Sequence, residues 1–212
     1  DFSEDTYRTL MAADSAVMVV DAAKGVEDQT RKLFHVCSLR EMPIFTFINK
    51  MDREAQDPFQ LLEDIESELG IKTYPMNWPI GSGKEFKGVY DRKNERIIAF
   101  NGGNHGATEV EAIEGSVDDE RFREILGSAL HDKLMEDIEL LDIAGDEFDV
   151  EKVRTGELTP VFFGSALTNF GVEPFLENFL EMTTSPLPRQ SNIGEIDVFD
   201  ENFSAFVFKI QA

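Results

Sequence analysis

The residues of this chain that are best placed to do chemistry are the consecutive Asn49, Lys50, Met51 and Asp52. They follow the apolar run 44–48, whose β-branched and aromatic residues predict a buried strand. Ligands of open α/β sheets lie beyond the carboxyl ends of the strands, so these polar side chains would face such a ligand. The Asp52 carboxylate can accept two parallel hydrogen bonds, and guanine offers matching donors at N1–H and its 2-amino group. The Asn49 amide can bond the O6/N7 edge of the same base, and the Lys50 stem can lie along one base face.

Adenine would pair poorly with this carboxylate, because it has an acceptor at N1 and no 2-amino group. A buried carboxylate left without a partner costs on the order of 1–3 kcal/mol or more. The pattern Asn-Lys-x-Asp is the one by which GTPases recognise guanine. The alternative is a strand followed by an ordinary polar turn, which Asn and Asp also favour. This motif alone does not decide between the two.

A second polar turn supports the base-binding interpretation. The run 158–163 predicts another strand, and a glycine followed by Ser165, Ala166 and Leu167 comes directly after it. Small residues let backbone N–H groups approach a ligand closely. The Ala166 N–H is placed to bond guanine O6, and Ser165 can brace Asp52. Taken alone, this would be an ordinary strand-to-helix turn, but together with the first motif it favours a base site.

Composition limits the classes of protein to consider. The chain has 212 residues, 42% of them hydrophobic, so it can build a real core. No apolar run approaches the roughly 20 residues that span a membrane, so no membrane partner is expected. The single cysteine, Cys37, excludes an internal disulfide framework and fits a reducing, cytoplasmic location.

The charge of the chain is strongly acidic and unevenly distributed. Its formal net charge is −22, and residues 107–151 hold 16 Asp and Glu against 3 Lys and Arg. Such a chain is a poor general nucleic-acid binder, and DNA is not an expected partner. The remainder of the chain carries −9, so contact between another surface and RNA stays open. The acidic segment is either a solvated helical face or a docking surface for basic proteins.

Strand and helix patterns alternate along the chain and predict an α/β fold with a parallel sheet and right-handed crossovers. The strands are expected at residues 16–21, 44–48 and 158–163, and the helices at 3–13, 27–40, 58–70 and 172–182. The pattern breaks after residue 80 and resumes only at Leu158.

The interrupting segment, residues 81–157, is predicted to be an inserted α+β subdomain. Its expected elements are a β-hairpin, a flexible glycine-rich loop and two acidic helices, at residues 86–91 with 96–100, 102–106, 118–130 and 132–144. Residues 1–80 and 158–188 would then form one domain. Residues 189–212 would form a linker and, from Phe203, the first strand of a second, all-β domain.

Two other patterns are considered and rejected. Gly81-Ser82-Gly83-Lys84 resembles part of a phosphate loop, but the full pattern requires a Gly at position 78 and Ser or Thr at position 85. These positions hold Trp78 and Glu85, so the segment is predicted to be a flexible loop. The three histidines lack metal-ligand spacing, and we expect no metal ligands and no catalytic residues in this chain.

The motifs together resemble the G domain of the bacterial translational GTPases. Residues 1–10 resemble the stretch that follows that family's Asp-x-x-Gly-His motif, and residues 16–26, 49–53 and 164–167 resemble its next strand and its base-binding motifs. Within the family, residues 78–81, 86–91 and 203–212 favour the peptide chain release factors over elongation factor G, which shares the insertion.

This resemblance implies a P-loop GTPase-like three-layer fold that lacks its N-terminal strands, followed by the start of a β-barrel domain. It also implies GTP or GDP as ligand, read by Asn49, Lys50 and Asp52 with the help of Ser165, Ala166 and Leu167, and Mg²⁺ in the full-length protein. The phosphate loop, the metal-binding threonine and the catalytic-region histidine of the family would precede Asp1. We therefore expect this chain alone to bind nucleotide weakly and not to hydrolyse GTP. Its strand 16–21 would be left as an apolar edge.

The function implied by the resemblance is nucleotide binding within a ribosome-associated GTPase that promotes recycling of decoding release factors at translation termination. Its partners would be ribosomal RNA and proteins and, indirectly, the decoding release factors. One alternative is a translocase similar to elongation factor G. Another is a non-catalytic module that docks on a basic ribosomal protein through residues 81–157.

Overall fold

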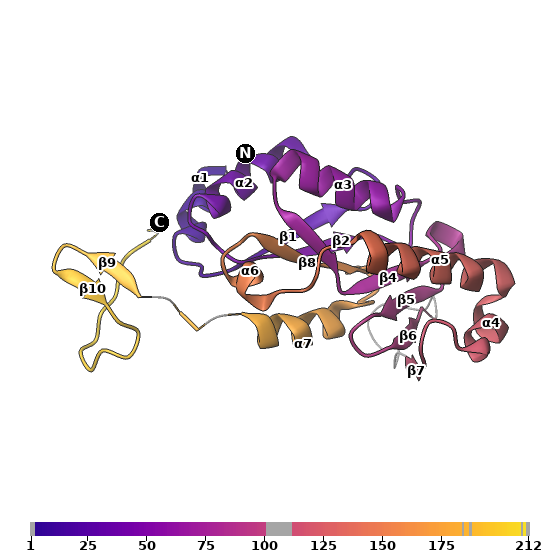
Figure 1. The fold of residues 1–212 in the computed structure, drawn as a ribbon. Coiled ribbons are helices and arrows are strands. Elements are labelled where there is room, and N and C mark those ends of the chain that lie inside the picture. The colour runs from indigo at the N-terminus through magenta and orange to yellow at the C-terminus, as the bar shows by residue number, and fades with distance from the viewer. Residues whose placement is uncertain (1–2, 101–111, 184, 187, 209, 211–212) are drawn as a thin grey trace.

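A four-stranded parallel sheet lies at the centre of the computed structural model, which describes residues 3–100, 112–183, 185, 186, 188–208 and 210. Helices flank the sheet on both faces, so the chain forms three layers (Figure 1). The sheet runs in the order β1, β2, β8, β3, and every neighbouring pair is parallel, which confirms the predicted α/β class. Its strands are β1 (Ala16–Asp21), β2 (Ile44–Asn49), β8 (Leu158–Phe163) and β3 (Lys72–Pro75).

Strand β2 is apolar on both faces because helices cover both of them. Ile44 and Ile48 belong to the cluster shared with α2 (Asp28–Ser38) and α3 (Pro58–Leu69). On the opposite face Phe45 packs edge-on against Phe179 of α7 (Val172–Met182), with the ring centroids 4.8 Å apart. The strand is therefore fixed from above and below up to Asn49, where the polar motif begins.

The segment after the Asn49 motif leads directly into a well-capped helix. The Asp57 Oδ1 atom accepts hydrogen bonds from the N–H groups of Phe59 and Gln60, at 3.0 and 3.3 Å, and Pro58 occupies the first helical position. Gly70, with φ of 71°, ends the helix in the left-handed conformation. The predicted helix boundaries are confirmed here.

The prediction that the sheet resumes only at Leu158 is wrong. Residues Lys72–Pro75 form β3, which pairs with β8 at the end of the sheet. The strand is four residues long and ends in proline, so its pattern is weak in the sequence. Proline is tolerated here because an edge strand has one side without ladder hydrogen bonds.

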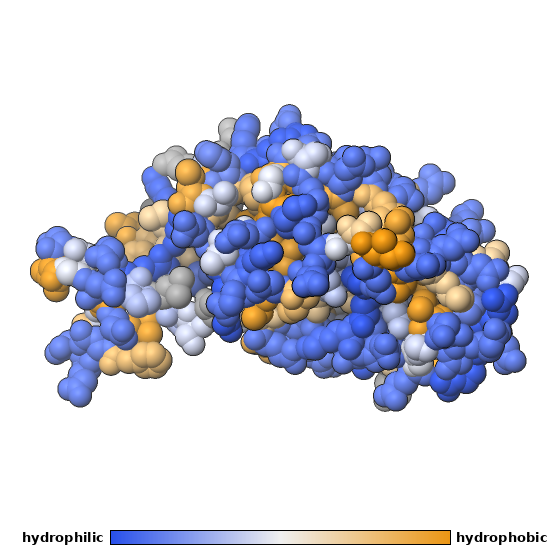
Figure 2. Space-filling view, in the orientation of Figure 1, coloured by the Kyte–Doolittle hydropathy of each residue, from blue (hydrophilic) through white to orange (hydrophobic). Residues whose placement is uncertain are grey.

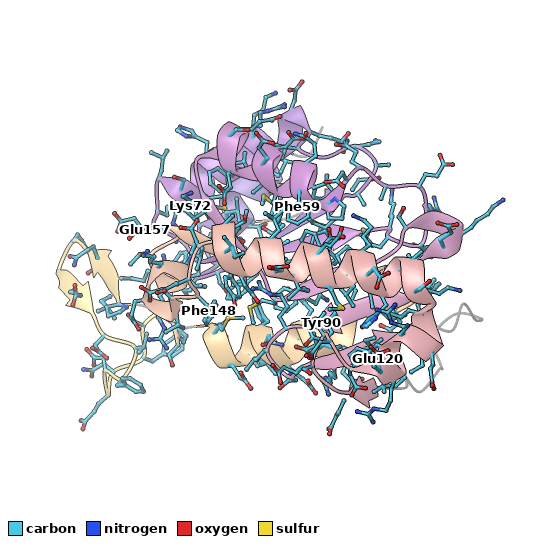
Figure 3. All side chains as sticks on the ribbon, turned by 45° about the vertical axis from the view of Figure 1, so that its right-hand side comes forward. Phe59, Lys72, Tyr90, Glu120, Phe148 and Glu157 are labelled. Atoms are coloured by element: carbon cyan, nitrogen blue, oxygen red, sulfur yellow. The ribbon has the colours of Figure 1, made fainter. Side chains whose placement is uncertain are left out.

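An antiparallel sheet begins immediately after β3 and contains the predicted hairpin. It runs β4 (Asn77–Ile80), β5 (Gly88–Asp91), β6 (Arg96–Ala99), β7 (Ala112–Glu114), with a single 3-10 turn over Gly83–Glu85. The glycine-rich loop predicted at residues 102–106, with His105, lies outside the described residues. Trp78 of β4 is fully buried and its Nε1 donates to Asp137 Oδ2 at 3.0 Å. Phe59 of α3, labelled in Figure 3, packs on Trp78 with ring centroids 4.6 Å apart. This contact belongs to one hydrophobic cluster that joins the two sheets.

The two acidic helices are present, but the predicted break between them is misplaced. Helix α4 spans Glu120–Leu126 and α5 spans Ser128–Ala144, so the chain bends at Gly127 and not near residue 131. Gly127 has φ of 83°, which favours glycine. His131 lies within α5, fully buried, with its Nε2 atom 2.8 Å from the Val117 carbonyl oxygen. A short helix that the sequence analysis missed, α6 (Val150–Arg154), leads back to β8.

The ends of the described chain depart from the expected pattern. Helix α1 spans Ser3–Leu10, which is shorter than the predicted 3–13. After α7, strands β9 (Arg189–Ser191) and β10 (Gly194–Ile196) form a small hairpin at one end of the molecule (Figure 1). The strand predicted from Phe203 is not formed: residues 203–208 have no regular structure and are exposed. A strand requires a neighbour for its backbone groups, and the described residues offer none there.

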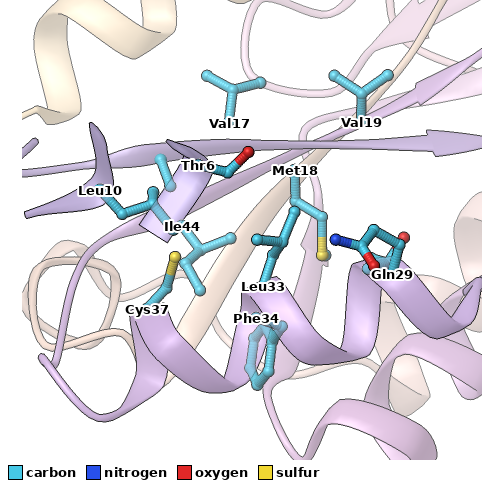
Figure 4. Close-up of a pocket in the computed structure, with 12 residues that line it drawn as sticks. Thr6, Leu10, Val17, Met18, Val19, Gln29, Leu33, Phe34, Cys37 and Ile44 are labelled. Carbon is cyan, nitrogen blue, oxygen red and sulfur yellow. The ribbon is translucent and has the colours of Figure 1, made fainter. Parts of the chain in front are cut away.

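Strand β1 is the other edge of the parallel sheet, as predicted. Its Val17 and Val19 are 42% and 57% exposed. A cavity of about 250 Å³ lies along this edge, between β1 and helix α2 (Figure 4). It is lined mainly by apolar side chains, among them Met18, Leu33, Phe34 and Cys37. None of the predicted base-binding residues lines this cavity.

Candidate functional site

The two polar turns predicted to bind a base lie side by side. They follow β2 and β8, which are neighbours in the sheet with Ile48 opposite Phe163. The backbone joins them further: the Gly164 N–H donates to the Ile48 carbonyl at 3.0 Å, and the Met51 N–H donates to the Gly164 carbonyl at 3.1 Å. The parallel register therefore brings the motif at residue 49 and the motif at residue 165 to the same end of the sheet.

Asn49 connects the two turns through its side chain. Its Oδ1 atom accepts hydrogen bonds from the Lys50 N–H at 2.8 Å and from the Ala166 N–H at 2.9 Å. This orients the amide so that Nδ2, a donor, has no partner within the described part of the chain. The Ala166 N–H, which the sequence suggested for guanine O6, is thus bonded to Asn49. Asn49 Nδ2 is one donor that remains available to the O6/N7 edge of a base.

Lys50 is held by a carboxylate that the sequence analysis did not identify. Its backbone has φ of 73°, and its Nζ lies 2.6 Å from Asp21 Oδ2. Asp21 is the last residue of β1 and lies opposite Asn49 in the sheet. Its Oδ1 atom also accepts from the Ala23 N–H at 2.9 Å. The hydrogen bond from Lys50, together with that from Ala23 and the charges of Lys50 and Lys24, lowers the pKa of Asp21 below its ordinary value. The sequence indicates Asp21 only through its position, because it is a carboxylate at the end of the strand that neighbours β2.

Asp52 lies in the turn after β2 and is half-buried. Its carboxylate makes no ion pair or hydrogen bond to any residue that the structure describes. The Ser165 hydroxyl is fully buried and has no hydrogen-bond partner among the described residues, so the predicted bond between Ser165 and Asp52 is not formed. A buried hydroxyl without a partner is rare in folded proteins. Leu167, in the same turn, is 60% exposed.

The chemistry that this arrangement offers is binding. One end of the sheet presents an amide donor at Asn49, an unpaired carboxylate at Asp52 and a lysine stem held by Asp21. A ligand would satisfy these groups if it offered acceptors to Asn49 on one edge and a pair of donors to Asp52 on another. Guanine has this pattern of donors and acceptors. Among the described residues, no cluster of three or more His, Cys, Asp or Glu could hold a metal ion. No helix in the described ranges has the length and apolar character needed to cross a membrane.

Comparison with known proteins shows what this chain is similar to. The model of the elongation factor Tu GTP binding domain matches residues 1–185. Peptide chain release factor 3 of Symbiobacterium thermophilum is 57% identical over all 212 residues, and that of Trichodesmium erythraeum is 55% identical. The predicted resemblance to the release factors is thereby confirmed. The chain spans 40% and 39% of the length of these two relatives.

A solved structure agrees with the fold. A crystal structure of a Thermus thermophilus protein superposes with a TM-score of 0.62 at 27% sequence identity, over 87% of this chain and 28% of that one. The family match covers most of the chain and includes both polar turns at the ends of β2 and β8. The chain therefore belongs to the family of elongation factor Tu GTP binding domains.

Proposed function

We propose that Asn49, Lys50 and Asp52, with Ser165, Ala166 and Leu167, form the guanine-binding part of a GTPase site. The proposal rests on two side chains at the same end of the sheet. The Asn49 amide is oriented by its two hydrogen bonds, and the Asp52 carboxylate has no partner among the described residues. Asp52 would accept from guanine N1–H and the 2-amino group, while Asn49 Nδ2 would donate to the O6/N7 edge. Lys50, held by Asp21, would place its stem along one face of the base.

The complete protein would be a ribosome-associated GTPase that acts in translation termination and promotes recycling of decoding release factors. Its similarity to peptide chain release factor 3 of two bacteria supports this assignment. It would bind GTP or GDP with Mg²⁺, contact ribosomal RNA and proteins, and act in the cytoplasm. The 212-residue chain by itself would not hydrolyse GTP, because its sequence contains no complete phosphate-loop pattern to hold the β- and γ-phosphates.

A chimeric release factor would test the base site. In this chimera the 212-residue chain replaces the matching segment of the Symbiobacterium thermophilum relative, to which it is 57% identical. Calorimetric titration should detect GDP binding. ADP should bind at least about 100-fold more weakly than GDP, because ADP leaves Asp52 unpaired. Equal affinities for GDP and ADP would refute the assignment of the base site.

A non-catalytic docking role is the second candidate, and one surface favours it. Helix α5 exposes acidic side chains together with Leu140 and Ile143, which are 50% and 76% exposed. Figure 2 shows a hydrophobic patch over α5 among otherwise hydrophilic side chains. If this surface alone recruits the chain, the Asp52→Ala chimera should still bind ribosomes, with no dependence on nucleotide. Loss of nucleotide-dependent ribosome binding in that variant would favour the GTPase role.

The remaining alternative, a translocase similar to elongation factor G, is separated by the state of the ribosome that is bound. A release factor should be recovered with ribosomes stalled at termination. A translocase should be recovered with pre-translocation ribosomes. Recovery of the chimera with both in equal amounts would speak against specificity for termination.

A further inference from the structure

The loop that follows β4 contacts the turn that carries Asp52. This loop, residues 81–86, contains the Gly-Ser-Gly-Lys sequence that fails as a phosphate loop. The Gly83 N–H donates to the Met51 carbonyl at 3.2 Å, and the Met51 N–H donates to the Gly164 carbonyl at 3.1 Å. Both backbone polar groups of Met51 are therefore hydrogen-bonded. Its carbonyl is bonded by the loop that follows β4, and its N–H is bonded to the turn that follows β8.

Gly83 also lies against the backbone just beyond Asp52. It has φ of 57°, and a Cβ atom placed on it would lie 3.4 Å from the Glu54 backbone nitrogen and 3.5 Å from the Arg53 carbonyl carbon. A side chain at this position would therefore be in ordinary van der Waals contact with the Asp52 turn, but in a left-handed backbone conformation that is unfavourable for any residue other than glycine.

The same loop reaches the second base-binding turn through Phe86. The Phe86 side chain is buried, and its ring packs perpendicular to that of Phe170 with centroids 5.5 Å apart. Phe170 closes the turn that begins at Ser165: the Ser165 N–H donates to the Phe170 carbonyl at 3.0 Å, and the Phe170 N–H donates back at 2.9 Å. Phe100, just after β6, packs on both rings at 5.2 and 5.3 Å. One loop thus touches both turns of the candidate base site.

We propose that the loop 81–86 is a brace for guanine recognition, in which Gly83 and Phe86 are positioning residues. Gly83 fixes the turn that carries Asp52, and Phe86 fixes the turn from Ser165 to Phe170. Because the loop joins β4 to β5, a displacement of the antiparallel sheet moves the turns of the base site. Conversely, nucleotide bound in the base site restricts the motion of the loop. This inference rests on the proposed function, since it gives these residues a role in the same site.

The test compares matched substitutions in the chimeric release factor. Gly83→Ala and Phe86→Leu disturb the brace. Gly127→Ala and Phe122→Leu are their controls. Gly127 has φ of 83° with open space around it, and Phe122 is a buried phenylalanine of α4 whose ring packs on Tyr90 of β5. The probes are GDP and IDP, because hypoxanthine lacks the 2-amino group that Asp52 would bind. Titrations are made well below the melting temperature of each variant.

We expect each brace variant to bind GDP about three- to tenfold more weakly, because Gly83→Ala shifts the turn that carries Asp52 and Phe86→Leu loosens the turn from Ser165 to Phe170. Their preference for GDP over IDP should also shrink, whereas both controls should keep it. If the loop had only a structural role, the brace variants would have lower melting temperatures but an unchanged ratio of GDP to IDP affinity. That result would overturn the proposal of a brace. In the unmutated chimera, hydrogen exchange at the Gly83 amide should slow when GDP is added, and unchanged exchange would also count against the proposal.

The outcome for the brace is distinguishable from the outcome for the base site. If the unmutated chimera does not prefer GDP over ADP, the proposed function is refuted. A clear GDP preference in the unmutated chimera, with Gly83→Ala and Phe86→Leu no different from their controls, would remove only the brace.

Discussion

The side-chain oxygen of Asn49 accepts a hydrogen bond from the Ala166 N–H at 2.9 Å, although 117 residues of sequence separate the two. The connection depends on the pairing of β2 with β8, since the antiparallel sheet and helices α3, α4, α5 and α6 come between them in the chain. One amide therefore links the turns that follow two neighbouring strands of the central sheet.

Replacing Asn49 by alanine should destabilise the chain. The Lys50 and Ala166 N–H groups would lose their acceptor, and the free energy of unfolding should fall by about 1–3 kcal/mol. Urea denaturation of the 212-residue chain measures this change. The control is Asn192→Ala, because Asn192 is exposed in the β9–β10 turn, and its unfolding free energy should change by less than about 0.5 kcal/mol. Equal effects in the two variants would show that the Asn49 bridge contributes nothing.

Replacing Asp21 by asparagine should loosen Lys50. The ion pair is partly exposed, with 45% of the Lys50 side chain accessible, so its loss should cost less than about 1 kcal/mol of unfolding free energy at pH 7. The larger expected effect is on function: GDP affinity of the chimera should fall, because the lysine stem is no longer held over the base. Unchanged GDP affinity would contradict the role given to Asp21.

The same carboxylate makes a pH-dependent contribution to stability. The pKa of Asp21 is lower in the folded chain than its ordinary value, chiefly because Lys50 donates to it. The stabilisation is therefore present above about pH 4, the ordinary range for Asp, and is lost as the pH falls through the folded pKa. The difference in unfolding free energy between the native chain and Asp21→Asn should shrink between pH 6 and pH 3. Asp28→Asn, at a carboxylate 92% exposed, is the control and should show little difference at either pH.

Much of the fold could be predicted because its central strands are buried on both faces. Strand β8, which is buried along its whole length, and helix α7 have the predicted boundaries, since a long apolar run and strong helix periodicity leave few alternatives. The edge strand β1 also has its predicted boundaries, because its sequence is a continuous apolar run. The four residues of β3 were missed because an edge strand of that length carries little pattern and because proline is uncommon within strands. The strand from Phe203 was predicted from a local apolar pattern, but a strand forms only where another strand can pair with it.

The proximity of the two polar turns could be predicted from the sequence, but the hydrogen bonds between them could not. Asn49 and Ala166 lie together as expected, but the structure uses the Ala166 N–H to hold Asn49. The role of Asp21 depends on which strand neighbours β2, and residue spacing does not contain that information. The contact from Gly83 was missed for the same reason, because it crosses from one sheet to the other.

A buried pair of hydroxyls in the central sheet offers a test of packing. Thr46 of β2 and Thr159 of β8 are fully buried, and their Oγ1 atoms lie 2.8 Å apart. Thr46→Val should lower the free energy of unfolding by about 1–3 kcal/mol, because Thr159 is left without this partner in an apolar core. The double variant Thr46→Val with Thr159→Val should recover most of that loss, because it removes both polar groups while keeping their shape. Additive losses in the double-mutant cycle would show that the two hydroxyls do not interact.

The most direct test of base recognition is Asp52→Asn in the chimeric release factor. An amide presents one acceptor and one donor, and xanthine presents N1–H and a carbonyl where guanine has its 2-amino group. The variant should therefore lose GDP affinity about 10- to 100-fold, the range expected for a two-bond contact to a base, and should gain affinity for XDP.

The control is Asp57→Asn, five residues further along the same segment. Asn caps a helix as well as Asp, so this variant should keep both its stability and its preference for GDP. A preference for GDP that persists in Asp52→Asn would mean that the carboxylate at position 52 does not contact the base. In that case the unpaired state of Asp52 would have to be explained by a partner other than guanine.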